Sequence, residues 1–123
     1  MSKRILIIDD DPGILEAISI ILEEEGYIVD TEEKSEVSFT KINRFKPHLI
    51  LLDILMSGGD GRIICKKIKK QKTTQHIPVI LISAHPNAEA SMVESGADGF
   101  LAKPFEVQDL LQMVSRAIPD ISA

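Results

Sequence analysis

The chain has 123 residues, 44% of them hydrophobic, and carries a net charge of −5. This length suits a single domain over residues 1–123, large enough to fold around its own core without cross-links. No apolar run approaches the roughly 20 residues that span a bilayer, and the acidic balance disfavours nucleic acid, so we expect a cytoplasmic protein with no membrane insertion and no direct nucleic-acid binding.

Strand and helix signals alternate along the first half of the chain. Residues 4–8 are an aliphatic run that predicts a buried strand, and Asp11-Pro12 is typical of the start of a helix, which we expect to end near Glu25. A short edge strand is expected at residues 27–31. The second helix is expected at residues 35–44, because its apolar residues keep helical spacing.

The central strand of the prediction is the apolar run at residues 47–53, which ends in a carboxylate. A run this short and aliphatic is typical of a strand that is buried on both faces of a parallel sheet. The elements expected after it are a loop at 57–61, a helix at 62–70, a strand at 77–82, a short helix at 87–95, a strand at 99–102 and a helix at 107–117 that Pro119 ends. Alternating strands and helices predict an α/β fold, a doubly wound parallel sheet with right-handed crossovers.

Polar residues gather where the predicted strands end. Asp9 and Asp10 follow the first strand, Asp53 ends the third, Ser83 follows the fourth and Lys103 follows the fifth. These ends meet at one edge of a parallel sheet, where ligands bind. Three carboxylates about 4 Å apart repel by roughly 4 kcal/mol per pair at an effective dielectric near 20, so we expect a divalent cation among them. Magnesium fits, because it takes oxygen ligands and leaves positions for a phosphate.

Five segments at these strand ends, in the same order, resemble the receiver domains of two-component response regulators over essentially the whole chain. They are Ile7-Ile8-Asp9-Asp10-Asp11, Leu51-Leu52-Asp53-Ile54-Leu55-Met56, Asp60-Gly61, Leu81-Ile82-Ser83-Ala84 and residues 96–105. The resemblance implies a flavodoxin-like (βα)5 sandwich with strand order 2-1-3-4-5. It also implies a signalling domain in a phosphorelay, which catalyses only its own phosphorylation and dephosphorylation and is not a turnover enzyme.

The resemblance assigns roles to the residues of this edge. It makes Asp53 the phosphoacceptor, and it makes Asp9, Asp10, Asp53 and the backbone carbonyl of Leu55 the ligands of Mg²⁺, with Mn²⁺ as a substitute. In this scheme Asp9 holds the metal through water, and Lys103 bridges to the phosphate.

The resemblance also implies a switch around the short helix at residues 87–95. Ser83 would hydrogen-bond a phosphoryl oxygen, and Phe100 would be the aromatic residue that turns inward as Ser83 moves. Phe100 lacks the hydroxyl of a tyrosine, and Ser57 stands where the family usually has proline. The bond before Pro104 is similar to the cis peptide of the family.

Two kinds of partner are implied, a sensor histidine kinase or histidine phosphotransfer protein and a downstream protein target. Neighbouring helical residues lie about 100° apart, so we expect Leu15 to be partly exposed and to form a docking patch with Ile14, Pro104 and Phe105. A monomer or a weak, phosphorylation-dependent dimer is expected. The initial methionine and the tail at 119–123 slightly favour a free-standing receiver over one cut from a longer chain.

Two other functions stay open. A pseudo-receiver would bind partners without phosphorylation, and a flavodoxin-like domain would bind a small ligand. The presence of every expected site residue weakens the first, and the lack of a glycine-rich phosphate loop after the first strand weakens the second. Metal-dependent uptake of phosphate separates all three.

Overall fold

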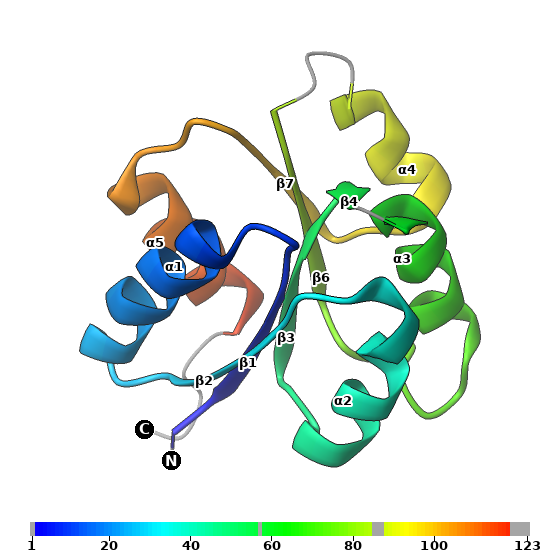
Figure 1. Cartoon of the computed structure of the whole chain (residues 1–123), viewed down its shortest axis with the longest axis horizontal. Helices are drawn as coiled ribbons and strands as arrows, with labels where there is room; N and C mark the ends of the chain where they lie inside the picture. The colour runs from blue at the N-terminus through cyan, green and yellow to red at the C-terminus, as the bar shows by residue number, and fades with distance from the viewer. Residues whose placement is uncertain (1, 57, 85–87, 119–123) are drawn as a thin grey trace.

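A parallel five-stranded sheet runs through the middle of the computed structural model (Figure 1), which describes residues 2–56, 58–84 and 88–118. Its strands are β1 (Arg4–Ile8), β2 (Ile28–Glu32), β3 (Leu49–Asp53), β6 (Val79–Ser83) and β7 (Gly99–Ala102). They lie in the order β2-β1-β3-β6-β7, and every neighbouring pair is parallel. The predicted fold and its strand order are confirmed.

Helices cover both faces of this sheet. They are α1 (Pro12–Glu24), α2 (Ser38–Phe45), α3 (Gly61–Lys70), α4 (Ser91–Ser95) and α5 (Val107–Ala117). Figure 1 shows α1 and α5 on one face and α2, α3 and α4 on the other. Among the described residues, no helix has the length and apolar character needed to cross a bilayer.

Strand β3 is central because all five of its residues are buried. Leu49 and Leu51 pack into the core under α1 and α5, whereas Ile50 and Leu52 pack into the core under α2 and α3. Burying such a side chain contributes about 1.5–3 kcal/mol, so β3 links the two halves of the core. The strand ends at Asp53, which the sheet thereby holds at its carboxyl edge.

Helix α1 begins where the sequence predicts. The Asp11 carboxylate accepts hydrogen bonds from the backbone N–H groups of Gly13 and Ile14, and Pro12 is the first helical residue. The predicted exposure of Leu15 is wrong, because its side chain is only 4% exposed. The stripe of α1 that faces the sheet is Leu15, Ile18 and Leu22, so Ile14 lies on the flank and is half-buried.

Several short elements depart from the expected outline. The 3₁₀ turn η1 (Ser35–Val37) precedes α2, and η2 (Ala88–Ala90) precedes α4. The expected loop after β3 contains a small antiparallel hairpin of β4 (Leu55–Met56) and β5 (Gly59–Asp60). Other strand and helix ends lie within two residues of the predicted ones. The expectations for Ser57, Asn87, Pro119 and the tail fall outside the described residues.

Candidate functional site

The carboxyl edge of the sheet brings the predicted polar residues together. Asp9 follows β1, Asp53 ends β3 and Lys103 follows β7, so three strands meet through these side chains. The Lys103 ammonium donates to Asp9 Oδ2 at 3.0 Å and to Asp53 Oδ1 at 3.3 Å. Asp9 is 2% exposed and Asp53 is 6% exposed. One cation therefore lies between two buried carboxylates.

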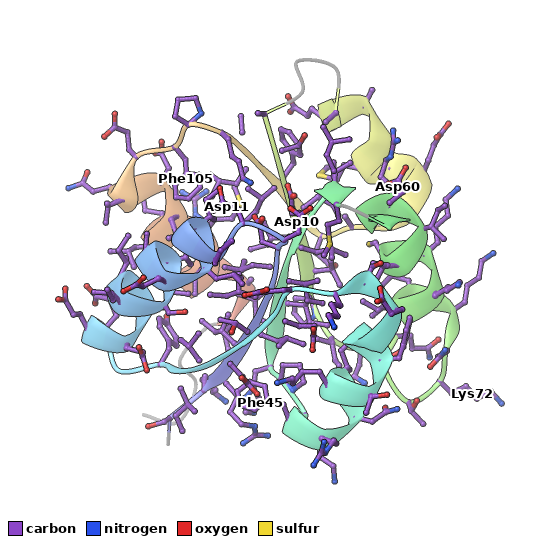
Figure 2. All side chains as sticks on the ribbon, viewed as in Figure 1. Asp10, Asp11, Phe45, Asp60, Lys72 and Phe105 are labelled. Carbon is purple, nitrogen blue, oxygen red and sulfur yellow. The ribbon has the colours of Figure 1, made fainter. Side chains whose placement is uncertain are left out.

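A third carboxylate completes an acidic cluster. One oxygen each of Asp9, Asp10 and Asp53 lies within 4.8 Å of the other two. Figure 2 shows Asp10 near the middle of the molecule, where the loop after β1 passes the end of the sheet. Opposite oxygen ligands of a magnesium ion are about 4 Å apart, so this donor set fits a hard divalent cation after a small adjustment of the side chains.

The electrostatics of the site support that fit. Burial raises the pKa of Asp53, the charges of Asp9 and Asp10 raise it too, and Lys103 opposes them, so that the pKa reaches about 6. Burial disfavours the charged form of Lys103, but its hydrogen bond with Asp9 and the charges of both carboxylates raise its pKa above the ordinary value. One ammonium thus does not neutralise three carboxylates, which leaves a net negative charge for a metal ion.

Backbone contacts fix the acidic residues in place. Asp9 Oδ1 accepts a hydrogen bond from the Asp11 N–H at 3.0 Å, which orients this carboxylate towards the edge. Gly61, the first residue of α3, donates its N–H to the Ile54 carbonyl at 2.8 Å. A Cβ at Gly61 would lie 2.1 Å from the Asp53 carbonyl oxygen, so only glycine lets α3 approach β3 this closely.

Comparison with known proteins identifies the family of the chain. The family model of the response regulator receiver domain matches residues 5–115. The chain belongs to this family.

Named relatives and a solved structure extend the receiver assignment. The chain is 36% identical over 113 residues to the DNA-binding dual master transcriptional regulator RpaA of Synechocystis, covering 90% of the chain and 47% of RpaA. It is 32% identical over 124 residues to the phosphate regulon transcriptional regulatory protein PhoB of Escherichia coli, covering 99% of the chain and 54% of PhoB. A putative response regulator from Chloroflexus aurantiacus superposes with a TM-score of 0.89 at 30% identity, covering 95% of this chain and 98% of that one.

These matches place the receiver domain in two-component phosphorelay signalling. The chain spans about half the length of the curated relatives RpaA and PhoB. The activity of those whole proteins is therefore not assigned to it.

The receiver domain places its predicted switch residues on two neighbouring strands, β6 and β7. Ser83 ends β6 and is 1% exposed, and its carbonyl accepts the Lys103 N–H at 2.8 Å. Phe100 of β7 is half-buried and packs against the core under α2 and α3, which includes Leu81 and Ala88. The predicted cis peptide between Lys103 and Pro104 is present.

An apolar cavity of about 430 Å³ lies beside the acidic site of the receiver domain. Ile14, Pro104 and Phe105 line it, together with Ile21 on the next turns of α1. Figure 2 shows Asp11 between Phe105 and Asp10, all three in the upper half of the view. Three of the four predicted docking residues thus line one cavity, and the buried Leu15 does not line it.

Two features of this edge escaped the sequence prediction. Asp60 caps α3 by accepting the Arg62 N–H at 2.8 Å, and its carboxylate forms an ion pair with the Arg62 guanidinium at 2.7 Å. Asp60, whose carboxylate is paired with Arg62, lies outside the three-carboxylate cluster. The close approach of Gly61 was also missed, although a glycine after a capping acid, just beyond a buried strand, is a readable sign of it.

Proposed function

We propose that the receiver domain accepts a phosphoryl group on Asp53 from a sensor histidine kinase or a histidine phosphotransfer protein. The observation that carries the proposal is the Lys103 ammonium, which contacts Asp53 and Asp9 beside the third carboxylate, Asp10. In the reaction, an Asp53 carboxylate oxygen forms a bond to phosphorus and the bond from phosphorus to the donor imidazole breaks. The product is an acyl phosphate.

Asp53 is a competent nucleophile near neutral pH. The pKa of Asp53 is raised to about 6 but still lies below 7, so about nine in ten of these carboxyls are ionised at pH 7. The Lys103 ammonium lies 3.3 Å from Asp53 Oδ1, where it stabilises negative charge on the incoming phosphoryl oxygens. The Ser83 hydroxyl, at the end of the neighbouring strand, donates a hydrogen bond to one of these oxygens.

Asp9, Asp10, Asp53 and the Leu55 carbonyl would hold Mg²⁺, or Mn²⁺ in its place. When bound, the ion supplies positive charge that the single lysine does not provide. Leu55 is an exposed residue of β4, two residues after Asp53 in the chain. Because the phosphoryl group leaves Asp53 only by hydrolysis or transfer, the domain acts on itself and not on a stream of substrate molecules.

The output of the domain would be a change in a protein-binding face built by α4, β7 and α5. Helix α4 has only five residues, and its Val93 side chain is 82% exposed, so little burial holds this helix in place. A phosphoryl group that draws Ser83 towards it would vacate space for Phe100 and shift α4. Coupling of this kind amounts to about 1–3 kcal/mol.

Intact-mass measurement after incubation with acetyl phosphate and Mg²⁺ tests the phosphoacceptor. We expect one added phosphoryl group, none with Asp53→Ala and none in excess chelator. Asp60→Asn is the matched control, because Asp60 lies at the same edge but is paired with Arg62. An adduct that survives Asp53→Ala contradicts the assignment, and no adduct at all would favour the pseudo-receiver function.

Amide hydrogen exchange with and without beryllofluoride tests the output face. We expect protection to change in residues 88–105 and to stay the same in α2. Equal protection of residues 88–105 in both states would mean that phosphorylation does not act on this face.

A further inference from the structure

A second cavity lies at the opposite end of the sheet, where the strands begin. Its volume is about 430 Å³, and its walls come from the start of β1, the end of α2 with the turn into β3, and the loop between α3 and β6. Figure 2 shows Phe45, in the last turn of α2, at the end of the molecule that lies away from Asp10. The cavity is therefore separate from the acidic site.

Every ionisable side chain that lines this cavity is basic. They are Arg4, Lys46, His48 and His76. Within residues 2–56, 58–84 and 88–118, no carboxylate forms an ion pair with any of the four. The net charge of the chain is −5, so the charge of this cavity is opposite in sign to that of the chain as a whole. It creates a local positive potential that favours an anion.

Hydrogen bonds hold two of these side chains in fixed positions. The Arg4 guanidinium donates to the Phe45 carbonyl at 3.0 Å and to the Lys46 carbonyl at 2.8 Å. The Arg4 N–H donates to His48 Nδ1 at 3.0 Å, so the neutral imidazole carries its proton on Nε2 and is a donor there. Burial lowers the pKa of His48, and the charges of Arg4 and Lys3 lower it further.

The third wall of the cavity is a well-ordered loop. The Thr74 hydroxyl is buried and donates to the Ile68 carbonyl at 2.7 Å. The Ile77 N–H donates to the Thr74 carbonyl at 3.0 Å, and Lys69 Nζ donates to the Ile77 carbonyl at 2.7 Å. The cavity is thus formed before any ligand arrives, which lowers the ordering cost of binding.

The rest of the lining is apolar and includes Ile42, Pro47 and Ile77. A volume of about 430 Å³ lies in the range of small-molecule sites. We propose that this cavity binds a small organic anion, with its phosphate or carboxylate group at Lys46, His48 and His76 and its apolar body against Ile42, Pro47 and Ile77. The proposal does not depend on phosphorylation of Asp53.

Titrations followed by amide NMR test the proposal with four probes. They are phenyl phosphate, benzoate, phenol and inorganic phosphate, all in excess chelator so that no metal at the acidic site contributes. Phenyl phosphate and benzoate separate a phosphate from a carboxylate as the preferred group. Phenol lacks the anion, and inorganic phosphate lacks the apolar body.

A double variant at two lining residues and a control variant outside the lining locate the binding. Lys46 has a φ of 54°, so Lys46→Asn keeps a residue that tolerates this backbone, and His76→Gln changes an exposed side chain. Lys72→Gln removes one charge from the same loop, and Figure 2 shows Lys72 at the outer edge of the molecule. Lys72 does not line the cavity.

We expect saturable shifts of the Lys46, His48 and Thr74 amides with phenyl phosphate or benzoate. The double variant should weaken binding by about tenfold or more, because the Lys46 ammonium and the His76 imidazole donor are both lost, while Lys72→Gln and Asp53→Ala leave it unchanged. The proposal is overturned if neither organic anion saturates, if phenol or inorganic phosphate binds as tightly, or if Lys72→Gln weakens binding as much as the double variant does. Loss of binding in Asp53→Ala would assign the anion to the acidic site instead.

Discussion

Replacing Asp53 by asparagine should stabilise the metal-free protein above pH 6 and have little effect near pH 4. The folded protein raises the pKa of this carboxyl from 3.8 to about 6, mainly through burial and the charge of Asp9. Below pH 3.8 the group is protonated in both the folded and the unfolded chain. Between the two values the folded protein holds a proton that the unfolded chain has lost, so stability falls as the pH rises, and the loss is complete above about pH 6.

The size of this loss follows from the difference between the two pKa values. A difference of about two pH units at about 1.36 kcal/mol per unit gives about 3 kcal/mol. Asparagine keeps the shape of the side chain but accepts a weaker hydrogen bond from Lys103 than a carboxylate does. We therefore expect Asp53→Asn to raise the free energy of unfolding by about 1–3 kcal/mol at pH 8.

Urea unfolding in excess chelator measures the effect at pH 4 and pH 8. Far-UV circular dichroism is the suitable probe, because the chain has no tryptophan. Asp60→Asn is the control of opposite sign: its hydrogen bond from Arg62 lowers the Asp60 pKa, so that variant should be destabilised at pH 8 and approach the wild type as the pH falls through that lowered pKa. A gain for Asp53→Asn that is equal at both pH values, or a loss at pH 8, would falsify the reasoning.

Three further outcomes are expected from measurements of unfolding by urea or by heat. Mg²⁺ at ten times its Kd should stabilise the wild type by about 1.4 kcal/mol and Asp53→Asn by less. The melting temperature of both proteins, measured over a titration with Mg²⁺, checks this. Gly61→Ala, whose Cβ would lie 2.1 Å from the Asp53 carbonyl oxygen, should lower the free energy of unfolding by more than about 2 kcal/mol. The Cβ of Gly59→Ala would meet only the Ser35 side chain, so this variant should lower it by less. Thr74→Val loses the hydrogen bond to the Ile68 carbonyl and should cost about 1 kcal/mol, and an unchanged urea midpoint would contradict that role.

The sheet and its acidic edge were predictable from local sequence patterns. The aliphatic runs that became β1 and β3 end directly in Asp9 and Asp53, and parallel topology brings such ends together whatever lies between them. The strand order came from the family resemblance and not from periodicity. Lys103 was placed by the same logic, and its contacts with both aspartates confirm that the strand ends meet.

The orientation of α1 was harder to predict, because its apolar face is wide. Ile14, Leu15, Ile18 and Ile21 all keep helical spacing, and the helix packs both on the sheet and on the core next to α5. Periodicity gives the spacing of such a face but not which residue lies at its centre. The β4–β5 hairpin was missed because each strand has two residues, too few to form an alternating pattern.

One end of the sheet is acidic and the other is basic. The length of β3 limits how strongly a charge at one end changes binding at the other. Five residues of strand span about 16 Å, across which two unit charges interact by about 1 kcal/mol at an effective dielectric of 20. Salt at 0.15 M reduces this further, because the screening length is about 8 Å. Charge alone therefore changes the affinity of the basic cavity for phenyl phosphate by less than about fivefold when beryllofluoride occupies the acidic site. A larger change in that Kd would require movement of β3 itself, since Pro47 lines the cavity and Asp53 ends the same segment.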